Sequence, residues 1–206
     1  MKRFPAIALI ELSNIASGIR VGDAMVKKAP IAMLKSGTIS RGKYLILIGG
    51  SVASVDESYH EGLRVSGPDC LDSLILPDVH PMVFDAVLGV RSEISAESIS
   101  ILETPTVSTT ILAADAAVKG SNVHILEMRL GDGYGGKGYT LFNGKIEDVQ
   151  TAIDISCEIA REKNVSASVS VIPLIHEAMM ENIHSSLRFG QSNPIHLSDG
   201  EQDVTG

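Results

Sequence analysis

Residues 131–138 have the spacing of a phosphate-binding loop. They read GDGYGGKG, which nearly matches the pattern G-x-x-x-x-G-K-[ST], in which backbone amides and a lysine hold phosphate groups. Two features argue against nucleotide chemistry. Gly138 stands where a serine or threonine would hold magnesium, and residues 139–142 have the pattern of a strand rather than of a helix whose N-terminus faces the phosphates. The segment is therefore predicted to be a glycine-rich turn between two strands.

Two pairs of residues could in principle carry acid–base chemistry. His80 and His176 each follow an I/L-P-x-x segment, and Glu11 and Glu103 each stand near the end of a strongly apolar run. Neither histidine has a nucleophile or a carboxylate at a suggestive spacing. We therefore interpret the histidines as residues at the starts of helices and the glutamates as acceptors of structural hydrogen bonds. No catalytic residue is predicted.

The composition excludes several classes of protein. Hydrophobic residues make up 44% of the 206 residues, and the formal net charge is −8, opposite in sign to that of a typical nucleic-acid partner. Every apolar run is well short of the roughly 18 residues that a membrane-spanning helix needs. No cleavage site follows the basic N-terminus, so no signal peptide is predicted and a cytoplasmic protein is expected. Cys70 and Cys157 have no metal-ligand spacing, and no metal site is predicted.

The chain resembles itself. Residues 7–29 align with residues 99–121 at an offset of 92, which grows to 94 and then to 96 further along the chain. The matched pairs are Glu11 with Glu103, Asp23 with Asp115, Lys27 with Lys119, and His80 with His176. Two small steps in the offset are what differences in loop length between two copies of one fold would leave. The sequence therefore predicts two homologous lobes, 1–92 and 97–188, followed by a flexible acidic tail, 189–206.

Each lobe shows the same order of elements. In the first lobe the pattern predicts strands at 6–12, 31–39, 44–48 and 71–76 and helices at 16–29, 52–65 and 81–88. The order β-α-β-β-α-β-α is that of the ferredoxin-like split βαβ plan with one added helix. The predicted fold class is α+β, with the polar segment 89–98 linking the lobes.

Taken together, these segments resemble bacterial microcompartment shell proteins over nearly the whole chain. The matching segments of the first lobe are AIALIEL (6–12), DAMVKKA (23–29), RGK (41–43), GGSV (49–52) and LPDVH (76–80). The second lobe repeats them as ILET, DAAVKGSNV, GGK, NGKI and IPLIH. Each motif is weak alone, but their order occurs twice. The resemblance is strongest to the tandem-domain, trimer-forming class, in the unpermuted element order, and within it to members from propanediol utilisation.

The resemblance implies a structural role. Three chains would form a homotrimer whose six microcompartment domains make a pseudohexameric tile, through heterologous contacts that close by rotation. Loops 37–41 and 131–135 would converge on a central pore that passes small polar metabolites. The residues implied to line it are Ile39, Ser40, Arg41, Asp132, Gly133, Tyr134 and Gly135. Ser40 and Tyr134 occupy matching places in the two loops.

The same resemblance assigns the edge of the tile to the repeated D-A-x-V-K segment. Lys27 and Lys119 match the family's edge lysine, and Asp23 and Asp115 lie one helical turn before them. Lysine stems can pack across a seam while their ammonium groups reach backbone carbonyls. The expected partners are other microcompartment shell proteins, and the expected location is the microcompartment shell.

One departure from the family concerns a cofactor. In the propanediol-utilisation members a cysteine stands at the place of Ser40, and three such cysteines hold an iron–sulfur cluster around the axis. A serine hydroxyl is a poor ligand for a site that prefers thiolates. Cys70 and Cys157 fall outside both loops. No cofactor is therefore expected.

Two other interpretations stay open at this point. The first is a sensor of paired ferredoxin-like lobes that binds a small molecule in the cleft between them. The second is an enzyme that uses Glu11 and Glu103, or His80 and His176. The mass in solution separates them from the shell protein, because a monomer or dimer would favour either alternative.

Overall fold

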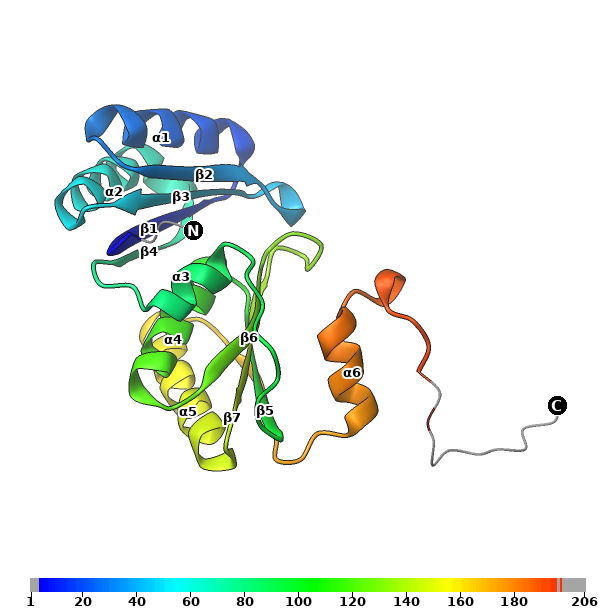
Figure 1. The fold of residues 1–206 in the computed structure, drawn as a ribbon. Helices are drawn as coiled ribbons and strands as arrows, with labels where there is room; N and C mark the ends of the chain where they lie inside the picture. The colour runs from blue at the N-terminus through cyan, green and yellow to red at the C-terminus, as the bar shows by residue number, and fades with distance from the viewer. Residues whose placement is uncertain (1–3, 196, 198–206) are drawn as a thin grey trace.

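The computed structural model describes residues 4–195 and 197, which form two lobes of the same architecture (Figure 1). The first lobe contains β1 (Ala6–Leu12), α1 (Ile15–Lys28), β2 (Met33–Thr38), β3 (Tyr44–Gly50), α2 (Val52–Ser66), β4 (Cys70–Leu76) and α3 (Pro81–Val87). The second contains β5 (Ser98–Thr104), α4 (Val107–Gly120), β6 (His124–Leu130), β7 (Gly138–Gly144), α5 (Ile146–Glu162), β8 (Ser168–Ile172) and α6 (Glu177–Ser185). Short 3-10 turns occur at Ser40–Gly42, Gly67–Asp69 and Phe189–Gln191.

The two sheets have the same topology. Each has four antiparallel strands, in the orders β2-β3-β1-β4 and β6-β7-β5-β8. In both lobes the first strand is central, which explains why all seven residues of β1 are buried. The predicted α+β class and the split βαβ order are confirmed. The predicted tail, 189–206, lies in part outside the described residues.

Several element bounds differ from the sequence prediction. The strand expected at 31–39 is shorter, because Ile31 donates to the carbonyl of Ala29 in a turn before the ladder begins. At its other end Arg41 has a φ of 68°, which takes the backbone out of the extended region. Helix α1 begins with Asn14 as its N-cap, whose side chain accepts from the amide of Ser17 at 2.8 Å.

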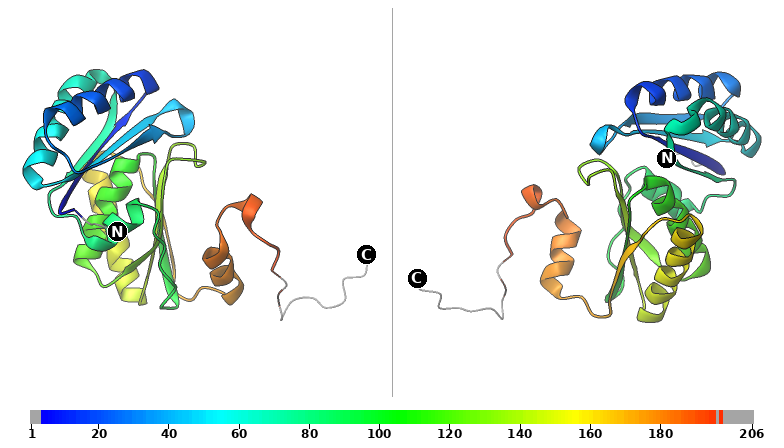
Figure 2. Two further views of the ribbon diagram at one scale, coloured as in Figure 1. Left: turned by 45° about the horizontal axis from the view of Figure 1, so that its top comes forward. Right: turned by 180° about the vertical axis from the view of Figure 1, so that it is seen from behind.

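A shared core joins the two lobes. Helix α3 lies between the first sheet and the second lobe, where it packs against α4 and β6 (Figure 2). Phe84 and Val83 of α3 belong to the same buried cluster as Leu9 of the first sheet and Ile111 of α4. The helix-facing side of the first sheet has a separate core. The lobes are therefore packed against each other through continuous apolar contact.

The segment between the lobes is more than a polar linker. Arg91 pairs with the buried carboxylate of Glu127 at 2.6 Å and also donates to the carbonyls of Ile183 and His184 at the end of α6. A cation at a helix C-terminus is favourable because the last carbonyls lack partners. Arg91 thus holds α6 against the second sheet. Within the described part of the chain no helix is long and apolar enough to cross a membrane.

Candidate functional site

The two predicted pore loops lie against each other at one end of the lobe junction. The amide of Gly133 donates to Ser40 Oγ at 2.9 Å, although the residues are far apart in the sequence. Lys43 Nζ donates to the carbonyls of Gly136 and Pro105, each at 3.2 Å. In Figure 1 the tips of the β2–β3 and β6–β7 connections approach each other. The structure therefore brings Ser40 and the glycine-rich loop together.

The path of the second loop depends on its glycines. Gly131, Gly133, Gly135 and Gly136 all have positive φ values, between 62° and 81°. L-residues with side chains rarely adopt this region, so the turn needs glycine. The loop joins β6 to β7 and no helix follows it, which confirms the predicted turn between strands and removes the nucleotide interpretation.

The residues of the loops differ in exposure. Arg41, Asp132, Gly133 and Gly135 are exposed, whereas Ile39 packs partly against the second loop. The ring of Tyr134 lies edge-on to that of Tyr139, with centroids 5.3 Å apart. Arg41 and Asp132 give the loop region charges of both signs.

Glu11 is buried at the junction between the lobes, and its carboxylate accepts a hydrogen bond from the second lobe. Its Oε1 pairs with Lys43 Nζ at 2.7 Å, and its Oε2 accepts from the amide of Val107 at 2.8 Å. Val107 is the first residue of α4, whose N-cap, Thr106, provides no side-chain cap. The Glu11 carboxylate therefore caps a helix of the other lobe. Burial raises the pKa of Glu11, while Lys43 and the Val107 amide oppose that rise. The predicted structural role is confirmed.

Asp72 forms a second polar contact across the junction, which the sequence did not indicate. Its Oδ2 accepts from Thr106 Oγ1 at 2.6 Å and from Thr109 Oγ1 at 2.7 Å, and Lys163 lies 2.7 Å from its Oδ1. Burial acts to raise the pKa of Asp72, but these donors outweigh it and hold the pKa below its usual value. In the second lobe Ser168 takes the equivalent place opposite Glu103. The difference between Asp72 and Ser168, at equivalent places in the two repeats, is the sequence signal that could have indicated this contact.

The histidines begin helices, as predicted. His80 Nδ1 accepts from the amide of Met82 at 3.3 Å at the start of α3, and His176 makes the same contact with Ala178 at the start of α6. The backbone amide of His80 also donates to Asp115 of the other lobe at 2.8 Å.

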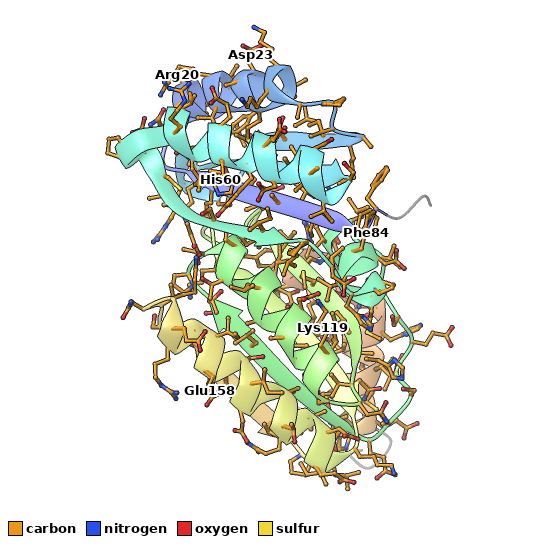
Figure 3. All side chains as sticks on the ribbon, turned by 90° about the vertical axis from the view of Figure 1, so that its left-hand side faces the viewer. Arg20, Asp23, His60, Phe84, Lys119 and Glu158 are labelled. Carbon is orange, nitrogen blue, oxygen red and sulfur yellow. The ribbon has the colours of Figure 1, made fainter. Side chains whose placement is uncertain are left out.

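The two predicted edge pairs have different surroundings. Asp115 is buried at the junction, and Lys119 pairs with it at 2.6 Å while donating to the carbonyl of Asp78 in the first lobe. Asp23 and Lys27 pair at 2.7 Å on the exposed face of α1. Figure 3 shows Asp23 at the outer end of the molecule and Lys119 near the middle. A contact of Lys119 between the lobes was not foreseen from the sequence.

Neither cysteine lies in the two loops predicted to line the pore. Cys70 lies in β4, at the opposite edge of the first sheet from β2, and burial raises the pKa of its thiol. Cys157 lies in α5, and both cysteines are free. The described residues contain no group of three or more His, Cys, Asp or Glu able to hold a metal ion. The donors at the pore loops do not fit a cluster that requires thiolates.

Residues 6–79 and residues 98–175 each match the model of the BMC domain. The chain belongs to this family of bacterial microcompartment shell proteins. It is 40% identical to the bacterial microcompartment shell protein PduT of Citrobacter freundii over 174 residues, which cover 84% of this chain and 95% of that protein.

Solved structures agree with the family assignment. A crystal structure of a microcompartment protein from Desulfitobacterium hafniense has a TM-score of 0.75 and 33% identity, over 87% of this chain and 99% of that chain. The fused permuted hexameric shell protein of the RMM microcompartment has a TM-score of 0.58 and 21% identity, over 78% of this chain and 84% of that chain, and shares the fold alone. Shell proteins of this family are structural and non-enzymatic, which removes the interpretation as an enzyme.

Proposed function

We propose that three copies of the chain close into a ring of six lobes, a homotrimeric tile of the shell whose pore passes small polar metabolites. The observation that carries this proposal is a difference in exposure between equivalent residues. Val107 and Ile111 of α4 are fully buried against the first lobe, whereas Ile15 and Ile19, their equivalents in α1, are 42% and 60% exposed. The first lobe thus exposes the same apolar helix face that the second lobe buries.

The opposite side of the junction is formed by α3 of the first lobe. Its equivalent in the second lobe, α6, leaves the corresponding surface exposed. Val83 of α3 is fully buried against the second lobe, and its equivalent in α6, Met179, is 51% exposed. Glu103 and Lys137 pair at 2.8 Å, as Glu11 and Lys43 do, but remain accessible to solvent. One end of the chain therefore complements the other, which suits a head-to-tail contact that closes into a ring.

If the contact between two chains has the same geometry as the junction between the two lobes of one chain, its polar partners follow from the equivalent residues. Glu103 of one chain would accept from the amide of Ile15 of the next, as Glu11 accepts from Val107. The amide of His176 would donate to Asp23 of that next chain, as His80 donates to Asp115. Each proposed contact has a counterpart in the internal junction, with the same type of donor and acceptor.

In the ring, the loops that meet at Ser40 and Gly133 would lie around the axis. Three copies each of Arg41 and Asp132 would give the pore a polar mouth of mixed charge, with Ile39, Tyr134 and Gly135 beside it. Other shell proteins would meet the tile at its edges, near Lys27 and Lys119 and their partners Asp23 and Asp115. In the single chain 73% of the Lys27 side chain is exposed, whereas Lys119 already donates to the carbonyl of Asp78 across the internal junction.

The test of this tile combines solution mass with electron microscopy. Multi-angle light scattering of the intact protein should give three times the chain mass, and concentrated protein should form hexagonal layers. Lys27→Ala should keep the trimer and lose the layers, because it removes the ammonium group at the seam. Lys28→Ala removes a neighbouring exposed charge and should leave the layers intact. A monomeric wild type, or ordered layers from Lys27→Ala under the same conditions, would contradict the proposal.

We further propose that the pore holds no iron–sulfur cluster. Ser40 Oγ already accepts a hydrogen bond from Gly133, and a hydroxyl does not replace a thiolate as ligand to such a cluster. Reconstitution with iron and sulfide should leave the wild type without stoichiometric visible absorbance, whereas Ser40→Cys should gain it. Absorbance in the wild type that survives substitution of Cys70 and Cys157 would refute the assignment.

A further inference from the structure

A cleft of about 340 Å³ opens between the outer face of the first sheet and β6 of the second lobe. Its floor is apolar and includes Leu9, Leu45 and Leu47 of the first sheet together with Met128 and Leu130 of β6. Ile39 and Tyr134, from the two pore loops, line one end. The cleft is thus built from both lobes beside the loops.

The cleft exists because the first lobe lacks two large side chains that the second lobe has. In the second sheet Arg129 faces Tyr139 across the strands, and both contact Glu127; the tyrosine hydroxyl lies 2.9 Å from its Oε1. In the first sheet the equivalent pair is Gly37 and Leu45. Among the described residues, a Cβ placed on Gly37 would meet nothing within 4 Å. The same place in the fold is therefore filled in one lobe and open in the other.

The charges in the cleft also differ from those at the equivalent place in the second lobe. Lys35 faces Leu47, the place that Glu127 takes opposite Leu141 in the second lobe, so a cation replaces a buried anion. Lys35 and Arg188 line the cleft, and neither forms an ion pair within the described part of the chain. Arg129 also lines it but is paired with Glu127, and Asp132 is the acidic residue of the lining. The cleft therefore presents two unpaired cations beside an apolar floor.

One polar group in the lining is incompletely satisfied. The hydroxyl of Tyr134 is buried beside Tyr139 and forms no hydrogen bond of good geometry within the described residues. A buried hydroxyl that lacks such a bond is unfavourable, and a ligand oxygen would satisfy it. Its position on the cleft wall adds a neutral donor to the two cations.

We propose that this cleft binds a small organic anion with an apolar body. The body would cover the leucine floor, because removing apolar surface from water is favourable. The anionic group would lie between Lys35 and Arg188 and accept from the Tyr134 hydroxyl, since charge-assisted hydrogen bonds are the strong ones. A helix is about 10 Å wide, too large for an open cleft of about 340 Å³, which favours a small molecule over a peptide helix. The site lies within one chain and does not depend on the ring.

Titration calorimetry of the intact protein with hexanoate tests the proposal, with hexan-1-ol as the neutral probe of similar size. One hexanoate should bind per chain, and hexan-1-ol should bind about tenfold or more weakly, as expected for loss of one charge-assisted bond. Lys35→Met and Arg188→Met should each weaken hexanoate binding by about tenfold. Lys145→Met, a matched loss of an exposed charge at the start of α5, should leave the affinity unchanged.

A second variant tests the cavity itself. Gly37 has no positive φ and open space around it, so Gly37→Leu should fold normally and fill the cleft. Hexanoate binding should then disappear, while the solution mass stays that of the wild type. Absence of binding to the wild type, equal affinity for the two probes, or undiminished binding to Gly37→Leu would overturn the proposal. Because mass and binding are read separately, failure of the ring and failure of this site are distinguishable.

Discussion

Ile19→Asp should convert the trimer to folded monomers. Ile19 is 60% exposed in the single chain, so a charge there is tolerated by the fold, but in the proposed ring it occupies the place that Ile111 has in the internal junction. Burying an isoleucine side chain contributes about 1.5–3 kcal/mol, and an unpaired buried carboxylate adds a penalty. The change is present at every contact between chains. Light scattering should therefore report the chain mass, with an unchanged circular dichroism spectrum.

Two control variants test whether this effect is specific to the exposed face of α1. Ile146 is 42% exposed in α5, and its equivalent Val52 is 46% exposed in α2, so this position lies outside the repeated junction in both lobes. Ile146→Asp should therefore remain trimeric. Ile111→Asp places the same charge in the buried internal junction and should destabilise the chain itself. If Ile19→Asp stayed trimeric while Ile146→Asp dissociated, the assignment of the α1 face would be wrong.

Glu11→Ala should lower the free energy of unfolding by about 3 kcal/mol or more, the range found when one partner of a buried ion pair is removed. Glu11 is fully buried, and its loss leaves Lys43 without its counter-ion and the first amide of α4 without its cap. Chemical denaturation of the monomeric Ile19→Asp background gives this value without a contribution from assembly.

Glu103→Ala is the matched comparison. Its pair with Lys137 is accessible to solvent in the single chain, and exposed pairs contribute only about 0–1 kcal/mol. In the monomeric background this variant should therefore change stability little, whereas in the wild-type background it should weaken the trimer. Equal effects of the two glutamates on the monomer would contradict the structural distinction between them.

Much of the architecture could be predicted because it depends on local patterns. The apolar run of β1, the spacing of the helices and the twofold recurrence of each motif are readable along the chain, and they correctly predicted two split βαβ lobes. The first sheet confirms the strand 6–12 to the residue. The sequence pattern predicts the end of β2 one residue too late, because the turn at Arg41 depends on a backbone conformation with no sequence marker other than the glycine beside it.

The polar contacts between the lobes were not predictable in the same way. Asp72, Lys163, Arg91 and Glu127 have no equivalents in the repeat motifs, and their partners are distant in sequence. The cleft likewise follows from Gly37 and Leu45 standing where the second lobe has the larger Arg129 and Tyr139, and only the fold shows that these two positions face each other across the strands.

The sequence by itself determined that this chain is a duplicated split βαβ domain, because repetition and hydrophobic periodicity are properties of residue order, and the resemblance of its motifs indicated the shell family. Only the tertiary structure decided how equivalent residues divide their roles. Asp115 and Asp23 stand in the same motif, yet one is buried against the other lobe and the other faces solvent. The physical reason is that burial and pairing depend on which surface the fold brings to each copy, and one chain covers only one of its two equivalent helix faces.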